Sequence, residues 1–305
     1  MQSHPFFSDR RVVFFLASFC CFLWGSAYPA IKNGYAMFGI TANDIPSKML
    51  FAGYRFAFAG LLLLVLALLM RRNIFVMNAR NLLSTSLLGL TQTSLQYTFF
   101  YIGMAYTTGV KSSIMISTGT FFSVLMAHFI YRNDRLNANK IVGCLIGFAG
   151  VMAVNFSADL LDFRFTLRGE GFVVIAAFIL SAATIYGKKL SQTMDSVVLT
   201  GYQLSIGGFA LVVLGHATGG TFSGFSVQST ALMTYMVLLS SAAFALWTVL
   251  LKYNQVGMIS VYNFLVPIFG AVLSAIFLGE SILEWKNVAA LLFVCGGVWL
   301  VTRER

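Results

Sequence analysis

The sequence predicts an all-α membrane protein with ten transmembrane helices, arranged as two inverted five-helix repeats around a central cavity. Three observations predict this fold. Of the 305 residues, 58% are hydrophobic and only 10% are charged, whereas soluble domains carry about 25% charged residues. Apolar blocks recur along the whole chain, and the second half repeats the pattern of the first. A soluble globular domain is therefore excluded.

Ten apolar blocks separated by short polar loops define the expected spans, because about 20 helical residues cross the ~30 Å hydrocarbon core of a bilayer. The first block is expected to stay in the protein, since no small-residue cleavage signal follows it. In chain order the expected spans are Val12–Phe38, Ser47–Met70, Asn81–Gly103, Gly109–Tyr131, Asn139–Asn155, Gly169–Gly187, Ser196–His216, Thr230–Leu251, Gly257–Leu278 and Trp285–Thr302.

The basic residues predict the orientation of these spans. If the N-terminus is cytoplasmic, the inner segments hold thirteen Lys and Arg residues and the outer segments hold six. Cytoplasmic loops of membrane proteins carry the excess of Lys and Arg. Both termini are therefore expected in the cytoplasm, with the protein in the cell inner (plasma) membrane and no nucleic acid as partner.

An internal repeat divides the chain into residues 1–155 and 156–305. An offset of 147 aligns residues 106–154 with residues 253–301, and an offset of 148 aligns three further pairs. Each half holds five spans, an odd number, so the second half enters the membrane from the opposite side. Inverted repeats of this kind often build transporters, with the substrate site near the midplane. The matched pairs include Tyr106/Tyr253, Ser113/Ser260, Phe122/Phe269, Gly150/Gly297, Tyr54/Tyr202 and Gly60/Gly208.

Several short motifs carry a resemblance to a known family. They are Trp24-Gly25-Ser26, Tyr54-Arg55-Phe56, Pro267 and the run from Ala275 to Ser281. With the span count and the repeat, they resemble the drug/metabolite transporter superfamily, in its ten-helix EamA-type branch. The resemblance implies an exporter or permease of amino acids or related metabolites, with a cavity between the halves. The first half departs from the family pattern at Thr120 and Arg132-Asn133.

Arg55 is the basic residue that the expected topology leaves well inside a span. Burial of an arginine in a membrane costs at least ~2.5 kcal/mol unless it finds a partner or water. Two interpretations stay open. The guanidinium either binds a substrate carboxylate in the cavity, or braces the structure through backbone carbonyls or by reaching outward.

Polar side chains at helical spacing predict the cavity wall. Thr85, Gly89, Gln92 and Gln96 follow one another at spacings of four, three and four, which puts them on one face of a helix, and Asn263 lies on a similar stripe. Small polar residues also permit close helix packing, but the amides are costlier to hide. The cavity candidates are Arg55, Gln92, Gln96, Asn263, Trp24, Tyr28, Tyr101, Tyr202, Gln203 and Trp247.

Two prolines inside spans predict bends. Pro267 has no N–H and clashes with the carbonyl of Asn263 four residues earlier. Pro29 is expected to bend the first span in the same way, with Gly25 one turn before it. Gly25, Pro29 and Pro267 are therefore candidates for gating or for a fixed bend.

The sequence offers few groups for ion coupling. No Asp or Glu falls near the middle of an expected span, which favours facilitated diffusion, although His128 and Glu280 are candidates for titration. No metal site and no cofactor are expected. The protein is expected to export a small polar metabolite by alternating access, as a monomer or weak homodimer, with a small-molecule substrate and the lipid bilayer as partners. An open channel, an intramembrane enzyme and a structural membrane subunit are the alternatives.

Overall fold

A computed structural model describes residues 4–74, 78–156, 165–278 and 285–303. The described residues form helices and connecting loops without strands. Seven helical stretches are long and apolar enough to cross a membrane, from Arg10–Met37 to Val256–Phe277. The other three expected spans are helical as well, as a divided helix between Ala79 and Ala105 and as two shorter helices. The all-α class is confirmed, and the number of crossings stays a prediction.

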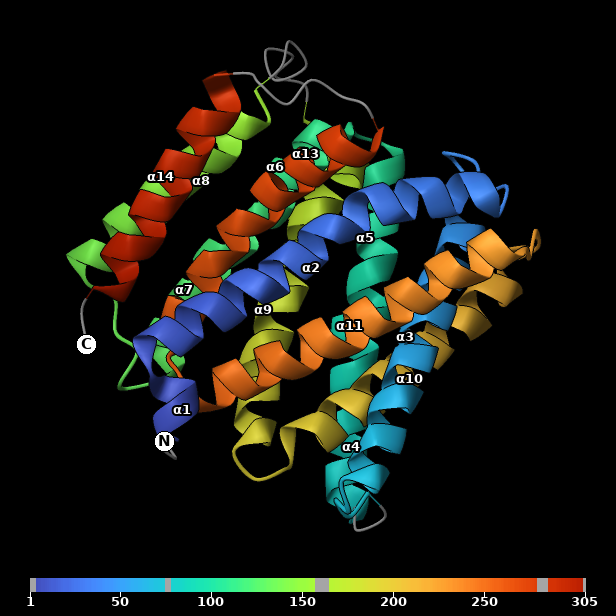
Figure 1. The fold of residues 1–305 in the computed structure, drawn as a ribbon, viewed down its shortest axis with the longest axis horizontal. Coiled ribbons are helices and arrows are strands. Elements are labelled where there is room, and N and C mark those ends of the chain that lie inside the picture. The colour runs from blue at the N-terminus through green and yellow to red at the C-terminus, as the bar shows by residue number, and fades with distance from the viewer. Residues whose placement is uncertain (1–3, 75–77, 157–164, 279–284, 304–305) are drawn as a thin grey trace.

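The helices follow one another through short loops (Figure 1). Their bounds are α1 Pro5–Ser8, α2 Arg10–Met37, α3 Ile45–Leu69, α4 Ala79–Gly89, η1 Leu90–Leu95, α5 Gln96–Ala105, α6 Gly109–Ser117, α7 Gly119–Ile130, α8 Ala138–Val154, η3 Leu167–Gly171, α9 Phe172–Ser191, α10 Ser196–Ala217, α11 Val227–Tyr253, α12 Val256–Ser260, η4 Val261–Phe264, α13 Leu265–Leu278 and α14 Trp285–Thr302.

Polar residues in the loops fix where the long helices begin. Asp9, Asn137 and Asp195 each accept a hydrogen bond from a backbone N–H in the first turn of the following helix. Such caps satisfy donors that have no partner inside the helix, at roughly 1 kcal/mol each. Ser226 and Ser229 form a reciprocal capping box at the start of α11.

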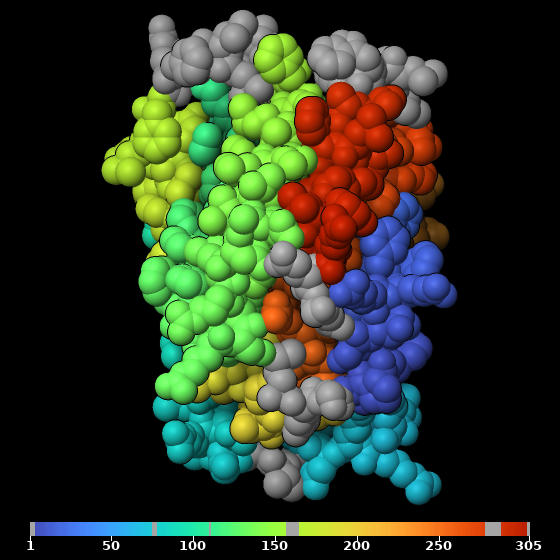
Figure 2. Space-filling model, turned by 90° about the vertical axis from the view of Figure 1, so that its left-hand side faces the viewer, coloured from blue at the N-terminus to red at the C-terminus, as the bar shows by residue number. Residues whose placement is uncertain are grey.

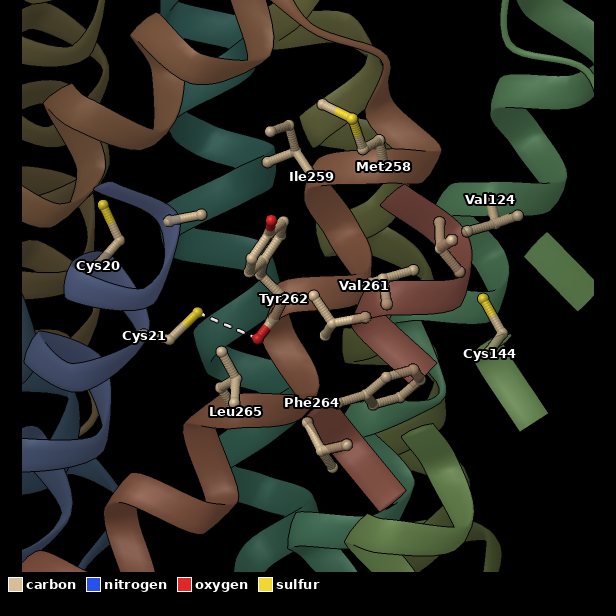
Figure 3. Packing of buried hydrophobic residues seen from close by; sticks show 14 of the residues in the cluster. Cys20, Cys21, Val124, Cys144, Met258, Ile259, Val261, Tyr262, Phe264 and Leu265 are labelled. Carbon is tan, nitrogen blue, oxygen red and sulfur yellow. Dashed lines mark hydrogen bonds between the residues drawn. The ribbon is translucent and has the colours of Figure 1, made fainter. Parts of the chain in front are cut away.

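Two helices change their hydrogen-bond pattern near the middle of the bundle. Between α4 and α5 the chain makes a π turn, which inserts one extra residue per turn. Between α12 and α13 it tightens to a 3-10 turn that ends at Phe264, three residues before Pro267, which has no N–H to donate to the Asn263 carbonyl. The Cys21 thiol donates to the Tyr262 carbonyl at 3.1 Å, as Figure 3 shows.

Glycines bring two pairs of helices into backbone contact. Along α3 and α10, an added Cβ on Gly60 would lie 2.5 Å from the Gly201 carbonyl, and one on Gly208 would lie 2.8 Å from the Gly53 carbonyl. Small residues permit such close approach inside membranes. Consequently α3 packs along the length of α10.

The same kind of contact joins α8 to α14, which lie side by side on the face shown in Figure 2. An added Cβ on Gly143 would lie 2.7 Å from the Gly297 carbonyl, and one on Gly297 would lie 2.5 Å from the Gly143 carbonyl. The glycines of α8 therefore serve intramolecular packing.

The helix α2 crosses the middle of the bundle, where it packs against α11 and α13 (Figure 1). On the other side, α9 packs against α5 and α7 in the same manner. An apolar cluster forms around the α2 crossing, and a second cluster between α3, α5, α10 and α11 includes Tyr101, with Tyr97 packed against it.

Candidate functional site

Arg55 lies inside the bundle, ten residues after the start of α3. Its side chain is only 3% exposed. The guanidinium Nε donates to the Ser240 hydroxyl on α11 at 2.8 Å, and the Cζ atom lies 4.4 Å from the centre of the Phe56 ring. Ser240 also donates to the Met236 carbonyl at 2.7 Å, so the serine acts as an oriented acceptor for the arginine.

Three tyrosines surround the guanidinium. Tyr97 lies within hydrogen-bonding reach of Arg55, and Tyr101 and Tyr35 both interact with it electrostatically. The buried Tyr35 hydroxyl faces Tyr101 but lacks a well-aligned hydrogen bond among the described residues. We call Arg55, Tyr35, Tyr97, Tyr101 and Ser240 the Arg55 cluster.

Among the described residues, Arg55 forms no ion pair. The ion pairs among the described residues are Arg72–Asp195, Lys111–Glu170 and Lys140–Asp134, and none includes Arg55. A buried guanidinium that is not paired with a carboxylate of the described residues can bind an anionic group of a ligand. Carboxylates favour a bidentate geometry for this contact.

Aromatic rings connect the Arg55 cluster to α2 and α11. Trp24 packs at 5.0 Å from Trp247 and at 5.5 Å from Phe244, with the rings edge to face. Phe56 continues this contact to Tyr97 at 4.8 Å. The rings make an amphipathic wall of the kind that lines small-molecule sites.

Tyr28 lies near this wall and is partly exposed. It keeps 41% of its surface exposed in the middle of α2, where its ring packs on Gly270 of α13. Its hydroxyl is close enough to Tyr97 to interact electrostatically. Tyr28 is therefore both partly exposed and near the aromatic wall.

The π turn rotates Gln92 away from Gly89, its neighbour on an α-helical stripe. Because of the π turn, Gly89 contacts the backbone of Gln203 on α10, whereas the Gln92 amide oxygen faces Gly187 on α9. Gln96 and Gln203 are buried, and the Gln96 Oε1 and Gln203 Nε2 atoms have no hydrogen-bond partner among the described residues. Unsatisfied buried amides are costly, so these atoms are candidates for water or ligand contacts.

The proline positions show local distortion and close packing. Asn263 lies half-buried in the 3-10 turn that precedes Pro267. Gly25 lies where α2 crosses α13, since an added Cβ would be 2.5 Å from the Phe269 Cβ. Pro29 lies inside α2, which is continuous from Arg10 to Met37. The expected irregularity at Pro267 is found in the structure, and gating by any of the three positions stays a prediction.

Two other expected site residues, Tyr202 and His128, are not brought to the Arg55 cluster. The Tyr202 hydroxyl donates to the Ile74 carbonyl at 3.0 Å, so the ring fastens the loop after α3 and does not line the middle of the bundle. His128 accepts the Leu136 N–H at 3.1 Å through Nδ1 and closes the turn after α7. Glu280 lies outside the described residues.

A polar network that the sequence did not indicate lies around the loop between α7 and α8 and joins the two halves of the chain. Asp134 pairs with Lys140 at 2.6 Å and accepts the Gly257 N–H at 2.9 Å. Lys188 donates to the Asn254 carbonyl and lies over the Tyr131 ring. Asp134 stands in a charged loop motif, Arg-Asn-Asp-Arg, so nothing in the sequence marks it as buried. We call these six side chains and backbone groups the Asp134 network.

Glu170, at the far end of the bundle from the Asp134 network, is a second missed group. It accepts hydrogen bonds from the Thr107 hydroxyl at 2.6 Å and from the Thr166 N–H at 2.8 Å, and Lys111 lies at 3.7 Å. The sequence signal was available, because an acid between two glycines begins an apolar block. The described part of the chain contains no group of three His, Cys, Asp or Glu side chains that could hold a metal.

Comparison with known proteins agrees with this architecture. The EamA-like transporter family model matches residues 11–156 and 167–303. The chain is 30% identical over 301 residues to the uncharacterized transporter YvbV of Bacillus subtilis (strain 168), covering 95% of this chain and 91% of that protein. It is 26% identical over 288 residues to an uncharacterized transporter of Archaeoglobus fulgidus, covering 93% and 94% respectively.

A solved crystal structure of a protein superimposes with a TM-score of 0.80 at 16% identity, covering 97% of this chain and 98% of that one. At this identity the likeness shows the fold alone. The family model covers nearly the whole chain, and the long apolar helices match its membrane character. The chain is a multi-pass membrane protein that belongs to the EamA-like transporter family.

Proposed function

We propose that the protein exports a small polar metabolite that carries a carboxylate, such as an amino acid or a related acid, across the plasma membrane. The observation that carries this proposal is the Arg55 guanidinium. It is buried among hydroxyls and aromatic rings, and it forms no ion pair with the described acidic residues. In this function the carboxylate binds Arg55, and the aromatic wall from Trp24 to Tyr97 receives the remainder of the substrate.

Reciprocal contacts support two inverted five-helix repeats, residues 1–155 and 156–305, for this transport. At an offset of 148, Gly53 and Gly60 correspond to Gly201 and Gly208. The contact of Gly53 with Gly208 then has its counterpart in the contact of Gly201 with Gly60. Such exchange is what a two-fold axis between α3 and α10 produces. The family model also matches two successive segments of the chain.

Alternating access follows if the two repeats rock against each other around the Arg55 cluster. The Asp134 network closes one end of the passage in the present conformation, and we place this end in the cytoplasm together with both termini. Opening towards that side requires the contacts between Asp134 and Gly257 and between Lys188 and Tyr131 to separate.

Uptake by purified protein in liposomes tests the proposal. We expect saturable transport of carboxylates, without a required pH gradient, and no transport of the matching amides. The Arg55→Met variant should lower carboxylate transport by about 10- to 150-fold, since a hydrogen bond to a charged group is worth about 1.5–3 kcal/mol. The Arg55→Lys variant should retain part of it, because charge is kept and the bidentate fork is lost.

The matched control is Arg72→Gln, which removes an arginine that pairs with Asp195 at a helix start. This variant should transport at the rate of the wild type. Carboxylate transport by Arg55→Met at the wild-type rate would contradict the proposal. Uptake that does not saturate would favour an open channel.

A further inference from the structure

A groove of about 190 Å³ lies where the start of α2 meets the end of α14. It is separate from the Arg55 cluster, because its lining comes from the first turns of α2, the last turns of α14 and the α12–η4 segment. Figure 2 shows this side of the molecule, with α14 above the beginning of α2. The groove therefore opens on the outer surface of the bundle.

Two arginines form the polar part of this groove. An Arg10 guanidinium nitrogen donates to the Arg303 carbonyl at 3.2 Å, and the Arg303 guanidinium lies 5.0 Å from the centre of the Trp299 ring. The described ion pairs engage Asp134, Glu170 and Asp195 with other cations. Asp9 accepts N–H groups of the first turn of α2, and Asp44 accepts the Ser47 N–H in the first turn of α3.

The remaining lining is apolar and reaches along the lipid-facing surface. Trp299 is 59% exposed and Phe14 is 48% exposed, whereas Met258 and Tyr262 are buried and form the floor. Two guanidinium groups thus sit at the end of an exposed aromatic wall. An anionic headgroup attached to an acyl chain has the same division into charged and apolar parts.

We propose that this groove binds an anionic glycerophospholipid, with its phosphate on Arg10 and Arg303 and an acyl chain along Phe14 and Trp299. Charge complementarity selects the occupant, because basic groups at the cytoplasmic end of helices attract the anionic lipids of that leaflet. A soluble anion would use the arginines and leave the aromatic wall without a role. The groove adds a lipid-binding site that the proposed transport function does not require.

The test uses the purified full-length chain in a neutral detergent and counts bound lipid by native mass spectrometry. Short-chain phosphatidylglycerol should bind at least tenfold more tightly than phosphatidylcholine of the same chain length. The double variant Arg10→Gln/Arg303→Gln should weaken phosphatidylglycerol binding by about 30-fold, because each basic residue near an anionic lipid contributes roughly fivefold. Arg132→Gln/Arg135→Gln removes the same charge from an exposed loop and should bind as the wild type does.

A second variant keeps the proposal testable if the Arg10→Gln/Arg303→Gln protein does not fold. Trp299→Ala keeps both arginines and should lose phosphatidylglycerol affinity several-fold, since the apolar wall and the stacked position of Arg303 are removed. Equal affinity for the two lipids, or equal losses in the groove and loop variants, would overturn the proposal. Inorganic phosphate that competes with phosphatidylglycerol at equal concentration would assign the groove to a soluble anion and would also overturn it.

Discussion

The Asp134 network and the Arg55 cluster both bury charged groups, but they satisfy the charge differently. Asp134 has a cation, Lys140, at 2.6 Å and a backbone N–H at 2.9 Å. Arg55 has the Ser240 hydroxyl and tyrosine neighbours, and no ion pair among the described residues. The first site pairs its charge within the protein, whereas the second has no counterion in the part of the chain that the structure describes.

We infer from this difference that the Asp134 network stabilises the fold and that the Arg55 cluster binds a ligand. A buried pair is costly to break, because removal of one member leaves an uncompensated charge. A buried cation with neutral neighbours contributes little to folding, since its desolvation offsets its hydrogen bonds. Stability should therefore depend on Asp134, and ligand binding should depend on Arg55.

The largest effect is expected for Asp134→Ala. Loss of the carboxylate leaves the Lys140 ammonium buried without its partner, and unfolding should become easier by about 3–5 kcal/mol. Chemical denaturation in detergent measures this change. The double variant Asp134→Leu/Lys140→Met should recover most of it, and equal stability of the single variant and the wild type would remove the distinction between the two sites.

A smaller loss, about 1.5–3 kcal/mol, is expected for Lys188→Met, which removes a charged hydrogen bond to the Asn254 carbonyl. The same denaturation experiment measures it. Lys189→Met is the matched control, because the neighbouring lysine is exposed. Equal losses of stability in the two variants would show that Lys188 does not contribute to the Asp134 network.

Adjacent serines on α11 sharpen the comparison further. Ser240→Ala removes the Arg55 acceptor and should raise the KM for a carboxylate about fivefold, which corresponds to one hydrogen bond of ~1 kcal/mol. Ser241 donates instead to the Ala59 carbonyl on α3 at 3.1 Å. Ser241→Ala should lower stability slightly and leave the KM unchanged. A raised KM in Ser241→Ala with an unchanged KM in Ser240→Ala would place the substrate away from Arg55.

The smallest change in stability is expected for Arg55→Met, at less than ~1 kcal/mol. The cost of burying an arginine in a membrane, ~2.5–3.5 kcal/mol, offsets the hydrogen bonds that it makes. Thermal unfolding followed by size-exclusion chromatography checks this expectation. A loss as large as that of Asp134→Ala would identify Arg55 as a structural brace.

Features that depend on helix length and composition could be predicted from the sequence. The apolar blocks gave the helices, and the position of Arg55 within its block gave a buried guanidinium. Pro267 gave the irregular turn that precedes it, because a missing N–H acts locally. Trp24 and Trp247 contact each other, and their role as cavity residues, with Tyr101, stays a prediction.

Features that depend on the rotation of each helix could not be predicted. A helix that is apolar on all sides gives no periodic signal for the face that points inward. The sequence therefore predicts the same cavity role for Tyr202 and Tyr101, whereas the Tyr202 hydroxyl donates to the Ile74 carbonyl in the loop after α3. The π turn at Leu90–Leu95 has no sequence signature, and it moves Gln92 towards α9. Asp134 and Lys140 become a buried pair only through a fold-back of their loop.

The glycine contacts between α8 and α14 have a mechanical consequence. Gly143 and Gly297 place bare peptide groups against each other, so these contacts are non-directional dispersion forces. Such a contact allows two rods to slide lengthwise by small amounts but resists their separation, because the attraction falls steeply with distance. A methyl group at Gly143 would lie 2.7 Å from the Gly297 carbonyl and would force the two helices apart.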